Sequence, residues 1–212
     1  DANACALAEW QLGAGKGCRN MIFLTFGTGL GAGLILNGEL YSGTNGMAGE
    51  AGHIRLAEDG PVGYGKAGSF EGFCSGGGIA QLGQVMAEEA LDREEIPSFC
   101  QSKGELFKVN ARTIAEAAEK GDPLALKIYD IVADRLGQGL AILVDLLNPE
   151  KIVIGSIFLR QEKLLRPRME KILNKEALGQ SVSVVEVVPA GLGEKLGDYA
   201  AVSVGLRAYQ KK

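Results

Sequence analysis

A glycine-rich segment at residues 27–33 has the composition of an anion-binding turn. It reads GTGLGAG and follows a short apolar run. A glycine-rich turn between two strands can direct several backbone N–H groups at one point, and the Thr28 hydroxyl adds a donor. We therefore take Gly27, Thr28 and Gly29 as candidate phosphate contacts. A glycine-rich hairpin without a ligand would give the same pattern.

Two other phosphate-binding motifs do not fit the sequence. Gly27, Gly29 and Ala32 satisfy the loose dinucleotide-binding fingerprint, but that motif must open a helix. The residues that follow, 34–38, are typical of a strand and a turn. Residues 15–17 (GKG) lack the spacing and the Ser or Thr of a P-loop.

The second segment with reactive side chains is residues 43–53, GTNGMAGEAGH, which contains the only histidine of the chain. Glu50 and His53 are three residues apart, and Asn45 precedes them. A carboxylate accepts hydrogen bonds from two hydroxyls, and an imidazole both accepts and donates. The segment therefore predicts binding of a polyhydroxylated ligand. A loop glutamate and a structural histidine are the alternative interpretation.

Three further features carry weaker signals. Glu71 precedes Gly76-Gly77 and a helical pattern, and a bare helix N-terminus binds anions. Asp1 stands at the start of a helical pattern, where an aspartate is usually an N-cap. Gly155-Ser156 follows a β-branched run, and α/β sheets bind ligands at such strand ends, although simple turns have the same sequence.

These segments need strands and helices to hold them, and the hydrophobic pattern predicts both. Strands are expected at residues 21–26, 33–36, 39–41, 52–56, 151–155 and 182–188, and helices at 2–12, 78–91, 110–119, 124–147, 161–173 and 197–209. Tight turns join the early strands, whereas helices separate the late ones. A β-meander followed by β-α-β-α predicts a single α/β domain with a mixed, ribonuclease H-like sheet.

The composition is that of a globular protein, and it argues against several classes of function. The chain has 212 residues, a net charge of −4 and 31 glycines, about twice the usual share. This slight acidity argues against a protein that coats nucleic acid. The uncharged stretch between Arg19 and Glu39 is rich in glycine, so we expect no membrane span. Four cysteines without a C-x-x-C pair fit a reducing, cytoplasmic compartment, and the start at Asp1 indicates a piece of a larger protein.

Taken together, the motifs resemble those of the ROK family of sugar kinases and sugar-responsive repressors. The resemblance covers nearly the whole chain. It is carried by residues 1–3 (DAN), 27–33 (GTGLGAG), 37–40 (NGEL), 46–53 (GMAGEAGH), 70–71 (FE) and 151–155 (KIVIG). The specific part is the glycine-rich turn combined with the Ala-Gly-Glu-x-Gly-His stretch.

The resemblance implies an actin-like ATPase fold of two ribonuclease H-like lobes around a cleft, with this chain as the C-terminal lobe. It implies that Asp1 is the general base on the sugar hydroxyl and that residues 27–29 receive the ATP phosphates. The family's sugar-contacting positions are matched by Glu50, His53 and Glu71. Gly155-Ser156 stands where the family usually has a Gly-Gly pair near adenosine, so the serine is a departure.

A second departure concerns zinc. Many members of the family carry a C-x-C-G-x-x-G-C-x-E motif, whose cysteines bind zinc together with the matching histidine. Counted back from Glu71, the cysteine positions hold Val62, Tyr64 and Ser69, none of which supplies a thiolate. We therefore expect no structural zinc and a loop that Val62 and Tyr64 hold by packing. His53 is then left to act on the sugar alone.

The resemblance thus predicts an ATP-dependent kinase that phosphorylates a hexose or an N-acylhexosamine at its 6-hydroxyl, with Mg²⁺ accompanying the nucleotide. Expected partners are the sugar, ATP and further copies of the chain in a homo-oligomer, with no nucleic acid and no membrane. The family's first phosphate loop, Asp-x-Gly-Gly-Thr, does not occur in these residues, so the chain alone is expected to show little activity. The main alternative is the sugar-sensing effector domain of a repressor, and a third is a catalytically dead sugar-binding lobe.

Overall fold

The computed structural model describes residues 2–210, which fold around one five-stranded sheet. Its strands are β1 (Met21–Phe26), β2 (Leu30–Leu36), β3 (Glu39–Tyr41), β6 (Lys151–Ile154) and β7 (Glu186–Pro189). Their order is β3-β2-β1-β6-β7, with the first three antiparallel and β1, β6 and β7 parallel. The predicted mixed sheet, a meander followed by strand–helix units, is confirmed.

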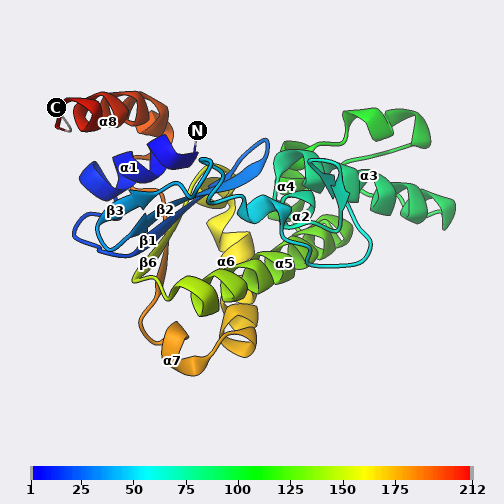
Figure 1. Cartoon of the computed structure of the whole chain (residues 1–212). Coiled ribbons are helices and arrows are strands. Elements are labelled where there is room, and N and C mark those ends of the chain that lie inside the picture. Colours follow the sequence, from blue (N-terminus) through cyan, green and yellow to red (C-terminus); the bar gives the residue numbers. More distant parts are fainter. Residues whose placement is uncertain (1, 211–212) are drawn as a thin grey trace.

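Helices cover both faces of this sheet (Figure 1). Met21 and Phe23 of β1 pack on the face covered by α1 (Ala2–Leu12), and α8 (Leu196–Gln210) packs in turn on α1. Ile22 and Leu24 alternate with them and join the larger core beneath α5 and α6. This alternation is the two-residue period of a strand that is buried on both faces.

The remaining elements lie at the end of the sheet or connect its strands. They are α2 (Phe70–Phe73), α3 (Gly76–Asp92), α4 (Ala111–Glu119), α5 (Pro123–Leu147), α6 (Ile157–Glu176), α7 (Gly179–Val182), the hairpin β4 (Val62–Gly63) and β5 (Lys66–Ala67), and the 3-10 helices η1 (Ala51–His53), η2 (Lys103–Lys108) and η3 (Gly193–Lys195). No helix within residues 2–210 is long and apolar enough to cross a bilayer.

Side-chain caps fix where three helices begin. Ser75 Oγ accepts a hydrogen bond from the Gly78 N–H (3.0 Å) at the start of α3. Asn110 forms a capping box at α4. Asp122 caps α5, and Pro123 occupies its first turn. Such caps satisfy backbone donors that a helix leaves unpaired, so the sequence can mark these boundaries locally.

The strand predicted at residues 52–56 is wrong. Residues 51–53 form η1, and Arg55 makes only an isolated bridge to Ser69. A Cβ on Gly52 would lie 2.1 Å from the carbonyl oxygen of Leu30. The glycine therefore lets this segment pack across the beginning of β2 instead of pairing along it.

Two other strand boundaries also differ from the prediction. The segment expected to be a strand at 182–188 is helical at Val182, whose N–H donates to the Leu178 carbonyl (3.0 Å). β7 begins only at Glu186, because the turn ending α7 takes up the residues before it. β2 begins at Leu30 rather than at residue 33, which shortens the glycine-rich turn to Gly27-Thr28-Gly29.

A glycine in β2 sets how closely α1 approaches the sheet. A Cβ on Gly33 would lie 2.4 Å from the Ala2 carbonyl oxygen and 2.5 Å from the Ala6 Cβ. Only a residue without a side chain permits this contact between helix and strand. The first described turn of α1 is thereby held directly over β2.

Candidate functional site

The glycine-rich turn lies at the centre of the candidate site. β1 and β2 pair up to Phe26 and Leu30, and the Gly27 N–H donates to the Gly29 carbonyl (3.0 Å) across the turn. Thr28, at its tip, is exposed. The sheet thus holds the three predicted phosphate contacts together at one end of β1.

The predicted residues Gly155 and Ser156 lie beside this turn. β6 runs parallel to β1, and the Gly155 N–H donates to the Leu24 carbonyl (3.0 Å). A Cβ on Gly27 would lie 3.2 Å from Ser156 Oγ. Ser156 adopts φ 59° and ψ −112° immediately before α6. A serine in this left-handed region is strained, whereas a glycine would not be.

The start of α3 also reaches the turn. The Gly76 N–H donates to the Gly27 carbonyl (2.7 Å), and a Cβ on Gly77 would lie 3.9 Å from the Thr28 carbonyl oxygen. Three glycine-containing segments that are far apart in the sequence therefore meet at one place. Helix N-termini carry partial positive charge, so the start of α3 suits an anion held by the turn.

Glu71 connects this turn to a second group of residues. It lies on α2, which Ser69 caps by accepting a hydrogen bond from the Gly72 N–H (3.0 Å). Glu71 Oε2 accepts a hydrogen bond from the Leu30 N–H (3.0 Å), and a Cβ on Gly29 would lie 2.8 Å from the same oxygen. The carboxylate is therefore in contact with the first residue of β2.

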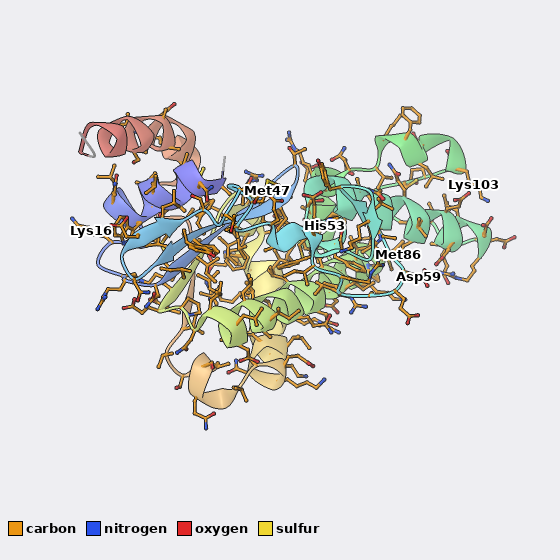
Figure 2. The ribbon with its side chains drawn as sticks, in the orientation of Figure 1. Lys16, Met47, His53, Asp59, Met86 and Lys103 are labelled. Atoms are coloured by element: carbon orange, nitrogen blue, oxygen red, sulfur yellow. The ribbon has the colours of Figure 1, made fainter. Side chains whose placement is uncertain are left out.

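Glu50 and His53 join Glu71 in one hollow of about 380 Å³. Its lining residues are Leu30, Met47, Glu50, Gly52, His53, Tyr64 and Glu71. Figure 2 shows Met47 and His53 where the sheet meets the helices α2 to α4. The three residues predicted to contact a polyhydroxylated ligand thus face a common space.

A second hollow, of about 470 Å³, adjoins the first. It is lined by Ala2, Asn3, Thr25, Gly29, Leu30, Gly31, Ala32, Gly46, Ala48, Gly49, Glu50 and Glu71. Leu30, Glu50 and Glu71 belong to both hollows. The two acidic side chains therefore stand between a space at the start of α1 and a space at His53.

Two of the residues predicted to act on the sugar, Asp1 and Asn45, are not placed in these hollows. Asp1 lies outside the described residues, whereas Ala2 and Asn3 of α1 line the second hollow. Asn45 is not among the lining residues of either hollow, and its side-chain oxygen accepts a hydrogen bond from the Met47 N–H (3.4 Å). Asn45 therefore shapes the loop that carries Met47.

His53 is exposed, and its neighbours come from the β4–β5 hairpin. Its ring meets the Tyr64 ring edge to face, with centroids 6.4 Å apart and an angle of 78° between the planes. Its carbonyl accepts a hydrogen bond from Lys66 Nζ (2.7 Å). Sequence reasoning missed this arrangement, because only Gly65 suits such a turn and Tyr64 is not a residue that it prefers.

The expectation that Val62 and Tyr64 hold their loop by packing is wrong. Val62 is 46% exposed and Tyr64 is 90% exposed. Hydrogen bonds hold the loop instead. The Val62 N–H donates to Gln81 Oε1 and the Val62 carbonyl accepts from Gln81 Nε2, both at 3.0 Å. Arg55 Nη1 also donates to the Ala67 carbonyl (2.9 Å).

The residues at the family's zinc positions do not fit a zinc ion. Val62 and Tyr64 offer no thiolate, and Ser69 is fully buried with its oxygen at the cap of α2. Within residues 2–210, no group of three or more His, Cys, Asp or Glu side chains could hold a metal ion. The absence of zinc remains a prediction.

Comparisons with known proteins assign the sequence of this chain to one family. The profile described as "ROK family" matches residues 1–204. The chain is 36% identical over 200 residues to a glucokinase of Halalkalibacterium halodurans, covering 93% of the chain and 59% of that relative. It is 33% identical over 207 residues to the DNA-binding transcriptional dual regulator NagC of Escherichia coli, covering 95% of the chain and 48% of that protein.

The solved structures include a close match in fold. A ROK family glucokinase from Streptomyces griseus, in complex with glucose and AMPPNP, superposes with a TM-score of 0.80 at 30% identity. The match covers 96% of this chain and 65% of that one. The α/β fold expected for an actin-like ATPase lobe is thereby confirmed. The chain spans about three fifths of the length of the glucokinase relatives, 59% and 62% for two of them.

Proposed function

Because this chain belongs to the ROK family, we propose that it forms the C-terminal lobe of a sugar kinase. The reaction would transfer the γ-phosphoryl group of ATP to the 6-hydroxyl of a hexose or an N-acylhexosamine. The observation that carries the proposal is the contact of Glu71 with Leu30, which places the candidate sugar residues directly beside the candidate phosphate turn. The glucokinase relatives support sugar phosphorylation, and the Streptomyces griseus complex supports a sugar and a nucleotide as ligands.

Each side of the site has a distinct task in this proposal. Glu50, His53 and Glu71 hold the sugar by hydrogen bonds, and the reacting hydroxyl lies in the second hollow, at the start of α1. Asp1 takes the proton from that hydroxyl, a role worth about 10²–10⁴-fold in rate. Holding the hydroxyl in line with the phosphoryl group would raise the rate further, because the reacting atoms are already oriented.

The glycine segments act on the nucleotide. The amides of the Gly27–Gly29 turn, the start of α3 at Gly76 and Gly77, and Gly155-Ser156 surround the space where the phosphates would lie. Preorganised donors of this kind stabilise the charge that develops during phosphoryl transfer. Mg²⁺ arriving with ATP would supply further neutralisation of that charge.

A sugar-sensing effector domain of a repressor is the second candidate function, and the similarity to NagC favours it. The assembled phosphate site favours the kinase, because a sensor needs neither a base nor a turn for ATP. The sequence upstream of Asp1 distinguishes them. An Asp-x-Gly-Gly-Thr segment there would support a kinase, and a basic helix-turn-helix would support a repressor. In either case, we place the protein in the cytoplasm as a homo-oligomer, with no nucleic acid bound through this chain.

A coupled ADP-release assay of the full-length protein against a panel of hexoses and N-acylhexosamines tests the proposal. We expect ADP release that depends on one of these sugars and that Asp1→Asn nearly abolishes without loss of sugar binding. Residues 1–212 alone should show little turnover, because they supply one side of the cleft. Sugar binding without any ADP release from the full-length protein would favour the sensor, and retention of most of the rate by Asp1→Asn would exclude Asp1 as the base.

A further inference from the structure

Tyr64 occupies a backbone conformation that its residue type disfavours. The two-residue turn Tyr64-Gly65 joins β4 to β5, with φ of 43° and 76°. Positive φ at both positions defines a hairpin turn that prefers Asn-Gly. A bulky aromatic residue is an outlier there, and such strain is kept where the surrounding structure or a function requires it.

The β4–β5 hairpin contacts both segments that carry candidate sugar residues, the one with Glu71 and the one with His53. A Cβ on Gly63 would lie 2.5 Å from the Gly72 nitrogen and 2.8 Å from the Glu71 Cβ, so β4 packs on the backbone of α2. On the other side, Lys66 Nζ donates to the His53 carbonyl (2.7 Å). Tyr64, at the tip, is therefore held close to Glu71 and His53, with which it lines one hollow.

Tyr64 is not part of the core. Tyr64 is 90% exposed, and Met47, which lines the same hollow, is 58% exposed. The hollow thus combines two large apolar side chains with two carboxylates and one imidazole. The polar groups suit sugar hydroxyls, and an apolar substituent on the sugar would in addition remove Tyr64 and Met47 from water, which is favourable.

We propose that this hollow binds the acylamino group of an N-acylhexosamine and that Tyr64 is a specificity-determining residue for it. The acyl methyl group lies against Tyr64 and Met47. The amide N–H donates to the carboxylate of Glu50 or Glu71, and the amide carbonyl accepts from an imidazole N–H of His53. This inference rests on the proposed function, because it assumes that the cluster holds a sugar, and it names the class of sugar.

Calorimetric titration of the full-length protein, without nucleotide, tests the inference with matched sugars. The pairs are glucose with N-acetylglucosamine and mannose with N-acetylmannosamine. In at least one pair, the wild-type protein should bind the N-acetyl sugar about tenfold more tightly than the parent hexose, the range that one buried methyl group provides. Tyr64→Ala should remove this preference while the Kd for the parent hexose changes less than about twofold.

Three further variants make the result specific. Tyr64→Phe keeps the apolar ring and should keep the preference. Tyr64→Asn removes the ring but suits the left-handed turn, so it should lose the preference in a hairpin that folds at least as well as the native one. Tyr41→Ala changes an exposed tyrosine on β3, outside the lining residues, and should behave as the wild type.

Two outcomes would overturn the inference. One is equal affinity of the wild-type protein for both members of each pair. The other is an equal loss for both members in Tyr64→Asn, which would mean that the ring supports the sugar ring in general. In both cases, ADP release with an unsubstituted hexose would leave the proposed function standing. Absence of sugar binding altogether would reject the proposed function itself.

Discussion

The Glu71 carboxylate accepts a hydrogen bond from the backbone N–H of Leu30 at 3.0 Å. This bond joins α2 to the first residue of β2, directly after the Gly27–Gly29 turn. One oxygen of the carboxylate is thereby held in place while the side chain lines both hollows. The position of a candidate sugar ligand is thus set by the same strand that carries the phosphate turn.

Replacing Glu71 by Gln should weaken sugar binding more than it weakens the fold. The amide oxygen can still accept from Leu30, so the free energy of unfolding should fall by about 1 kcal/mol at most. The lost charge removes a strong acceptor for sugar hydroxyls, and we expect the Kd for the sugar to rise about tenfold. Titration calorimetry and urea unfolding measure both. Glu116→Gln, on the exposed side of α4, is the control, and an unchanged sugar Kd in Glu71→Gln would contradict the assignment.

Gly29→Ala should displace the Glu71 carboxylate without unfolding the protein. The new methyl group would lie 2.8 Å from Glu71 Oε2, the end of a flexible side chain that can move away. The Leu30 bond would then be lost, and we expect a several-fold drop in kcat/KM with a cost in stability of about 1 kcal/mol. Gly104→Ala, which meets only Ser102 Oγ at 3.8 Å, should change neither quantity. Identical kinetics in the two variants would show that this contact has no role in the site.

The protein as purified should contain far less than one zinc per chain. The loop between His53 and Glu71 is held by Gln81 and Arg55 through hydrogen bonds to the backbone, and the family's cysteine positions hold no cysteine. Incubation with EDTA should therefore leave the Tm unchanged. Elemental analysis gives the zinc content directly. A stoichiometric amount of zinc, or a large fall in Tm with chelator, would refute this expectation.

Asp122 should make the stability of the fold depend on pH in the acid range. Burial alone would raise the pKa of this carboxyl, but hydrogen bonds from the backbone N–H groups of Ala125, Ser98 and Leu124 outweigh it and lower the pKa. A lowered pKa in the folded state means that the stabilisation is complete above the unfolded value, about 3.9, and is lost as the pH falls through the folded value.

The matched variant for this prediction is Asp122→Asn, which keeps a helix cap but does not titrate. At pH 7 the wild-type protein should be more stable than Asp122→Asn by about 0.5–1 kcal/mol, because a charged cap interacts with the helix dipole. This difference should shrink as the pH is lowered below about 4. Urea unfolding at both pH values measures it, and a difference that does not vary with pH would contradict the assigned cause.

The parts of the fold that the sequence predicted are those that local patterns determine. The apolar run of β1, the long helical pattern of α5 and the alternation of late strands and helices could all be recognised in short windows. The hairpin β4–β5 and η1 were missed, because contacts with distant residues form them. Gly63 packs on Gly72 and Gly52 packs on Leu30, and no nearby sequence pattern reveals either contact.

The candidate site was predictable in its residue types and less so in its arrangement. The resemblance pointed to Glu50, His53 and Glu71, and the structure places them around one hollow. The exposure of Tyr64 could not be foreseen, because a tyrosine in an apolar-looking loop is more often packed than presented to solvent. Its role depends on the hairpin, which tertiary contacts create.

The position of α1 over the sheet depends on the absence of a side chain at Gly33. An alanine there would press on the Ala2 carbonyl, 2.4 Å away, and would lift the leading turn of α1 off the sheet. That turn borders the space in which the acceptor hydroxyl would be activated. A substitution on the strand would therefore lower turnover as well as stability, because the backbone of α1 must move to make room for the methyl group.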